Sequence, residues 1–175
     1  MMDALSIRTI IMLVGGGALV IGAGLALLIG KGTKARFLRA HPDAAAIYVM
    51  GLAQAGHVEH VALTMIDGHR PHKFFFARVS GVYATPGRHQ AGVRYSVWAA
   101  GASRPEVRHQ FAMPVEVEPF GRHLLVFASG GTGPYSLLRL PSANQVDERS
   151  LMTFLHEEAE RGGYVTAAAI QQRFG

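Results

Sequence analysis

Nine histidines are the side chains of this 175-residue sequence whose types and spacing could do chemistry. They include two His-x-x-His pairs, formed by His57 with His60 and by His69 with His72. Imidazole is a common zinc ligand, so the pairs raise the hypothesis of a metal site completed by Glu59 or His89. In a β-strand, however, residues three apart point to opposite faces. We therefore expect His57 and His60 to diverge, and we predict neither a metal nor any other cofactor.

Other catalytic patterns are weaker still. Serine, histidine and aspartate all occur, but the sequence has no Gly-x-Ser-x-Gly motif. The glycine-rich segment 129–133 lacks the lysine of a phosphate-binding loop, and we interpret it as a connection between strands. The sequence has no cysteine, which excludes disulfides and thiolate metal sites. These observations predict that the protein is not an enzyme.

An uncharged apolar run from Thr9 to Gly30 is bounded by Arg8 and Lys31. About 20 apolar residues in a helix span the hydrocarbon core of a bilayer. The apolar region of a cleaved signal peptide is shorter, about 7–15 residues. The run therefore predicts a retained transmembrane helix over residues 9–30, preceded by a short tail over residues 1–8, in a single-pass protein of the cell membrane.

The basic residues cluster beside this predicted helix. They are Lys31, Lys34, Arg36 and Arg39. Most of the formal net charge of +5 lies within residues 1–39, which favours anionic headgroups as the partner and argues against nucleic acid. By the positive-inside rule, the following domain is expected on the cytoplasmic side.

Small residues recur at every fourth position of the predicted membrane helix. They are Ala18, Gly22, Ala26 and Gly30. Residues four apart share a helix face, and small side chains let a second helix come close. This ridge indicates a transmembrane homo- or hetero-oligomer, or it reflects only the high glycine content of the segment.

Short apolar segments broken by turn residues dominate residues 46–141. Val61, Leu63 and Met65 alternate with smaller or polar side chains, and so do Val93 and Tyr95. A period of two places one set of side chains in a core and the other in water. The pattern predicts a mainly β fold, an antiparallel β-sandwich-like domain that follows a basic juxtamembrane linker over residues 31–45.

Residues 142–175 show a different pattern and predict a short helical tail. Leu151, Phe154 and Leu155 mark the apolar face of one helix, with Asp147 as its N-cap. Thr166 is expected to cap a second, shorter helix.

Two turns have recognisable chemistry. Asp67-Gly68 follows one strand, and Pro86-Gly87-Arg88-His89 leads into another. Proline fixes φ at the second position of a turn, and glycine accepts a positive φ at the third. We therefore predict structural turns at both places, with the side chain of His89 bonding back across its turn.

These turns, together with the segments 115–118 and 121–124, make up a pattern that covers about half of the chain. The pattern resembles PEGA-like and related uncharacterised β-sandwich domains of bacterial surface and membrane-anchored proteins. Because its motifs are turns, the resemblance implies a fold and no activity.

Taken together, these features predict a membrane-tethered interaction or accessory module without enzymatic activity. One alternative is a membrane-anchored regulator whose tail resembles part of a helix-turn-helix unit. Another is an envelope enzyme that binds metal through the histidine pairs. Trp98 lies on the polar side of its predicted strand and marks either a binding surface or a second packed face.

Overall fold

The computed structural model describes residues 34–54, 57–76, 79–126, 135–161 and 165–175. The chain divides into two compact units, Met1–Ala40 and His41–Gly175. Residues 34–40 of the first unit are helical. The predicted transmembrane segment and its ridge of small residues lie outside the described residues. Among the residues described, no helix is both long and apolar enough to cross a bilayer.

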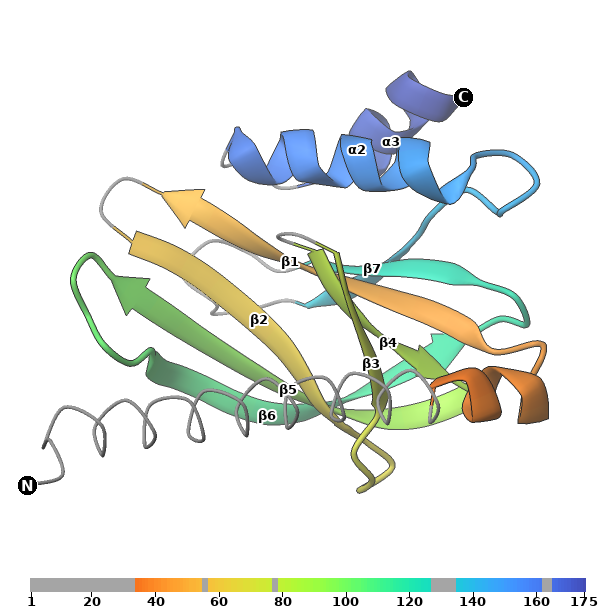
Figure 1. Cartoon of the computed structure of the whole chain (residues 1–175), viewed down its shortest axis with the longest axis horizontal. Helices are drawn as coiled ribbons and strands as arrows, with labels where there is room; N and C mark the ends of the chain where they lie inside the picture. The colour runs from red at the N-terminus through yellow and green to blue at the C-terminus, as the bar shows by residue number, and fades with distance from the viewer. Residues whose placement is uncertain (1–33, 55–56, 77–78, 127–134, 162–164) are drawn as a thin grey trace, which may run out of the picture. The chain divides into compact units, whose positions relative to one another are not determined.

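The second unit is mainly β, with two short helices at its C-terminal end (Figure 1). Its elements are β1 (Ala45–Gln54), β2 (His57–Ile66), β3 (His72–Phe76), β4 (Val79–Ala84), β5 (Gly87–Ala99), β6 (Glu106–Val117), β7 (Arg122–Val126), β8 (Ser136–Arg139), α2 (Glu148–Glu160) and α3 (Ala167–Phe174). The prediction of a mainly antiparallel β fold followed by a helical tail is confirmed.

One strand, β1, joins the two halves of the sheet. Its residues Ala45–Met50 pair with β4, while Gly51–Gln54 pair with β2. The sheet then continues from β2 through β5 to β6 on one side, and from β4 to β3 on the other. The two halves are thus parts of one eight-stranded sheet in the described chain.

The pairing of β1 with β7 departs from the predicted antiparallel order. These two strands run parallel, with Ala46 beside Arg122 and Val49 beside Leu125. Parallel neighbours need a long connection, and here the whole β2–β6 segment lies between them in the chain. Local alternation of side chains carries no information about such a pairing.

The hydrophobic core is formed by buried side chains of the strands and of α2. Val61 and Leu63 of β2 are buried against Tyr95 and Val93 of β5, which lie directly opposite them. In β1, by contrast, residues 47–50 are all buried, because the strand lies inside the sheet and α2 contacts it. Figure 1 shows α2 and α3 on one side of the sheet.

The predicted helix caps are confirmed. The Asp147 carboxylate accepts a hydrogen bond from the Ser150 backbone N–H at 3.0 Å, at the start of α2. The Thr166 hydroxyl accepts one from the Ala169 N–H at 3.1 Å, at the start of α3. The buried face of α2 contains Leu151, Phe154 and Leu155, as the spacing indicated.

Candidate functional site

The two His-x-x-His pairs lie in different parts of the fold. His57 and His60 are in β2, His69 is in the turn after it, and His72 begins β3. Among the described residues, no group of three or more histidine, aspartate or glutamate side chains is placed to hold a metal ion.

Glu59, named above as a further ligand, is the buried carboxylate of β2. It lies on the same side of the strand as Val61, and its side chain is 4% exposed. His57 Nε2 is 3.4 Å from Glu59 Oε1. The carboxylate also raises the pKa of the Tyr135 phenol, although burial of that phenol is the larger cause. Glu59 is therefore part of the interior of the domain.

Asp67 and His89 meet and connect the two turns singled out in the sequence. Asp67 and Gly68 form a two-residue hairpin turn with φ of +50° and +77°, closed by the backbone pair Ile66 and His69. His89 Nδ1 lies 2.6 Å from Asp67 Oδ2, and Gln90 N–H donates to Asp67 Oδ1 at 2.8 Å. The Asp67 side chain thus fixes the start of β5 against the β2–β3 turn.

The second ring nitrogen of His89 closes its own turn. Nε2 lies 2.7 Å from the Thr85 carbonyl oxygen, which can only accept, so Nε2 donates. Gly87, which follows Pro86 and begins β5, has φ of +124°. Burial lowers the pKa of His89, but the bonds to Asp67 and Thr85 and the Asp67 charge outweigh it, so the pKa is raised. An imidazolium with both N–H groups engaged stabilises the turns and is not available as a general base.

Replacing His89 with alanine is expected to lower the free energy of unfolding by about 1–2 kcal/mol near pH 6, since two hydrogen bonds of an imidazolium are lost. A histidine whose pKa is raised on folding stabilises the fold fully at pH values below its unfolded-state pKa of 6.5. This stabilisation is lost as the pH rises through the folded-state pKa. The pKa of Asp67 is lowered, chiefly by its hydrogen bond from His89. Asp67 therefore contributes to stability above pH 3.8, its ordinary pKa, and this contribution is lost as the pH falls further.

The difference in stability between the native chain and His89→Ala should therefore be largest between about pH 4 and 6.5 and should shrink on either side. Urea denaturation at a series of pH values measures it. His69→Ala is the control, because His69 lies in the same hairpin and its side chain is exposed. A difference that stays constant from pH 4 to 9 would contradict the charged pair.

A second network, partly buried, attaches the helical tail to the sheet. The Tyr48 hydroxyl donates to Glu148 Oε1 at 3.0 Å, although these residues are 100 positions apart. Arg122 donates from Nη2 to Glu148 Oε2 at 3.0 Å and from Nη1 to the Val146 carbonyl at 2.7 Å. Burial raises the pKa of the Tyr48 phenol, and the Glu148 charge and hydrogen bond raise it further. Tyr48 therefore stays protonated and acts as a donor.

An exposed apolar surface is formed by residues of β2, β5 and β6, near the C-terminal end of β1. We define the Trp98 patch as the residues Val58, Trp98 and Val107. They are 43%, 41% and 51% exposed, respectively. Val58 lies directly opposite Trp98, and Val107 lies opposite Ser96 on the next strand. The sequence pointed to Trp98, but it did not indicate its neighbours, because cross-strand partners depend on the register.

Arg94 lies on the same strand as Trp98, four residues earlier, and is exposed. No carboxylate of the described chain forms an ion pair with it. Burial lowers the pKa of His60, and the charges of Arg94 and Lys73 lower it further. Arg94 and Lys73 thus both lie near His60, which is opposite Ser96, two residues from Trp98.

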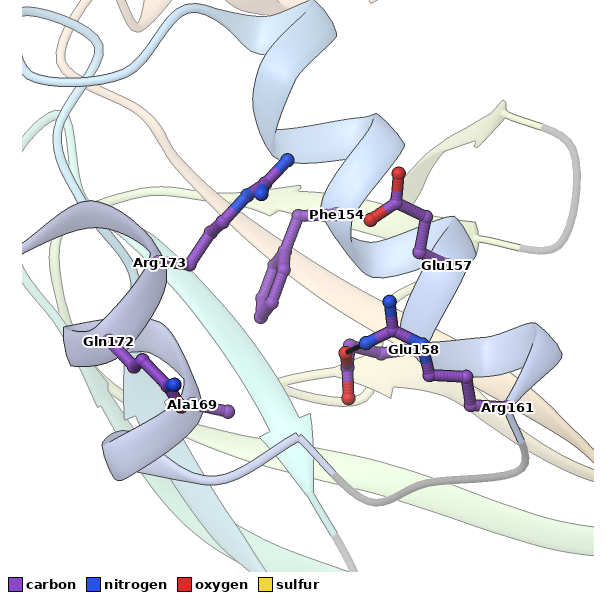
Figure 2. A pocket seen from close by; sticks show the side chains of 7 residues that line it. All are labelled: Phe154, Glu157, Glu158, Arg161, Ala169, Gln172 and Arg173. Atoms are coloured by element: carbon purple, nitrogen blue, oxygen red, sulfur yellow. Dashed lines mark hydrogen bonds and ion pairs between the residues drawn. The ribbon is translucent and has the colours of Figure 1, made fainter.

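A further candidate binding site is a pocket of about 290 Å³ between α2 and α3. Its lining includes Phe154, Glu157, Glu158, Arg161 and Arg173. Figure 2 shows Phe154 between Glu157 and Arg173, while Arg161 Nη1 lies 2.6 Å from Glu158 Oε1. Two carboxylates and two guanidinium groups line the pocket, so it has no net positive charge that would attract the phosphates of nucleic acid.

No family model, no curated protein and no solved structure matches the chain. The resemblance to PEGA-like domains therefore stays a prediction.

Proposed function

We propose that the protein is a single-pass membrane protein whose β-sandwich-like domain is a non-enzymatic interaction module. The uncharged run Thr9–Gly30 supports the membrane tether. The basic flank supports anionic headgroups as the lipid partner and a cytoplasmic domain. The ridge of small residues supports association with a second transmembrane helix.

The observation that carries the interaction role is the Trp98 patch with Arg94 beside it. Contiguous exposed apolar side chains mark interaction sites, and tryptophan and arginine are enriched in protein interfaces. The patch is built on three adjacent strands, so its side chains are held in fixed relative positions. Its chemistry suits a protein segment that presents an apolar side chain next to a carboxylate.

Two side chains that could take part in catalysis form hydrogen bonds within the fold instead, which supports a binding role over an enzymatic one. His89 has both ring nitrogens bonded, and the Tyr48 phenol is a buried donor to Glu148. Their observed contacts hold turns and helices in place.

Site-specific photo-crosslinking in membranes tests this function. With p-benzoylphenylalanine at position 98 of the full chain, we expect one discrete protein adduct in the membrane fraction. Arg94→Glu should abolish the adduct, because the carboxylate of the partner would then meet a like charge. The adduct should also weaken at high salt, since exposed charges are screened.

Arg88→Glu is the matched control. Arg88 is on the same strand, is 87% exposed at its side chain and pairs with Glu116 at 3.3 Å, away from the patch. It should leave the adduct unchanged. An adduct that Arg94→Glu does not affect, or no protein adduct, would contradict the proposed surface. Recovery of the full chain in the soluble fraction would contradict the tether.

A further inference from the structure

Phe120 combines an exposed aromatic ring with an unfavourable backbone conformation. It is 68% exposed, and its φ is +56°. It lies in the turn between β6 and β7, which the Gly121 N–H closes by donating to the Glu118 carbonyl at 3.0 Å. The third position of such a turn favours glycine or asparagine, and a bulky residue there is an outlier.

The backbone around Phe120 holds this conformation in place. The Phe120 N–H donates to the Asp43 carbonyl at 2.8 Å, and the Ala46 N–H donates to the Gly121 carbonyl at 2.9 Å. The turn is therefore bonded to the first residues of the domain. Because the ring itself is largely exposed, packing within the domain does not explain why a phenylalanine is held here. Strain of this kind points to a role outside the domain.

The position of Asp43 in the chain indicates what the ring meets. Asp43 follows Arg39 by four residues, a stretch that spans at most about 14 Å. Lys34, Arg36 and Arg39 belong to the basic flank that we assign to anionic headgroups. Wherever that flank binds lipid, the Phe120 turn lies within reach of the same surface.

The charges near the turn are compatible with an anionic surface. Glu118 pairs with Arg139 at 2.8 Å, and Glu116 pairs with Arg88 at 3.3 Å. These two carboxylates are thus balanced by arginines, whereas the Asp43 carboxylate has no ion pair among the described residues. Tryptophan and tyrosine are enriched at the boundary between headgroups and acyl chains, and phenylalanine is among the apolar side chains that interfacial helices bury there.

We propose that Phe120 inserts into the interfacial layer of an anionic bilayer and fixes the orientation of the domain on the membrane. This inference rests on the membrane tether of the proposed function. β1 leads from this end of the domain to Ala53, which pairs with Val58, and its 10 residues span up to about 33 Å. Phe120 and the Trp98 patch therefore lie toward opposite ends of β1.

A single-tryptophan reporter tests the insertion. The full chain carrying Phe120→Trp and Trp98→Phe is reconstituted in vesicles of phosphatidylcholine and phosphatidylglycerol, with and without brominated acyl chains. We expect a blue-shifted emission that brominated lipid quenches. The native chain, whose single tryptophan is Trp98, is the control and should not be quenched.

The outcomes separate this inference from the tether. A chain that stays with the vesicles while the reporter emits as in water overturns the insertion and leaves the tether intact. A blue shift without quenching indicates a protein contact and also overturns it. A chain recovered in the supernatant overturns the tether and this inference with it.

A second variant tests the strain independently of lipid. Phe120→Gly should raise the denaturation midpoint of the full chain in detergent, because glycine adopts a positive φ readily. A lower midpoint would mean that the Phe120 ring stabilises the domain by packing. Phe120 would then be neither exposed nor strained, and the proposed insertion would lose its basis.

Discussion

Gly81→Ala is expected to destabilise the β domain by about 3 kcal/mol, at the upper end of the cost of over-packing an interior. Gly81 is in the middle of β4, opposite Tyr48 of β1 on one side and Phe74 of β3 on the other. A Cβ added there would lie 2.6 Å from the Ile47 carbonyl oxygen and would clash with the Phe74 ring. Neither neighbour can move easily, because Ile47 is in the central strand and Phe74 packs against two tyrosines.

Gly87→Ala is the matched control for this prediction. Gly87 has φ of +124°, but no atom lies within 4 Å of the position its Cβ would take. Its cost should come from backbone conformation alone and amount to about 1 kcal/mol. Chemical denaturation of both variants with unchanged slopes measures the two costs. Equal losses would contradict the close approach of β3, β4 and β1 at Gly81.

The double variant Gly81→Ala with Phe74→Leu separates the two clashes. A smaller side chain at position 74 relieves the ring contact, but it leaves the Ile47 carbonyl where it is. We expect only partial recovery of stability. Full recovery would assign the whole cost to the ring.

Local features of this fold could be predicted from the sequence. Alternation in β2 and β5 correctly predicted the burial of Val61, Leu63, Val93 and Tyr95, because period two is a property of any strand with one covered face. It was wrong for Met65, which is 38% exposed where the register of β2 against β5 shifts, and for Ser96, which is buried. Asp147 and Thr166 were identifiable as caps, since capping depends on residues within one turn of helix. The Asp67-Gly68 turn has the same local origin.

Contacts between distant residues could not be predicted in this way. The parallel pairing of β1 with β7, the bond from Tyr48 to Glu148 and the pairing of Val58 with Trp98 all depend on which strands become neighbours. Single residues gave a partial signal: the sequence pointed to Trp98 and to His89. It gave no indication of Arg94, Val107 or Phe120, whose importance comes from register, exposure and φ.

Arg122→Met is expected to lower the free energy of unfolding by about 2–3 kcal/mol, because hydrogen bonds to a charged group are lost and their partners stay in place. The Arg122 side chain is 10% exposed and bonds both the Val146 carbonyl and Glu148. Methionine fills similar space without donors. The Val146 carbonyl then loses the Arg122 donor, and of its bonds to described residues Glu148 keeps the one from the Tyr48 hydroxyl.

Arg122→Lys should recover only part of this loss. A lysine keeps the charge but lacks the planar fork that bonds two acceptors at once. Arg139→Met is the control, because Arg139 and Glu118 are 72% and 52% exposed and such surface pairs contribute about 0–1 kcal/mol.

Hydrogen exchange shows where the loss falls. If Arg122 attaches the tail, amides of α2 and α3 should exchange faster in Arg122→Met while those of β2 and β5 keep their protection. A double-mutant cycle of Arg122→Met with Tyr48→Phe should give a coupling energy, since both side chains bond the same carboxylate. Additive losses with uniform exchange would mean that Arg122 stabilises the sheet alone, and that α2 is held by its apolar face without this network.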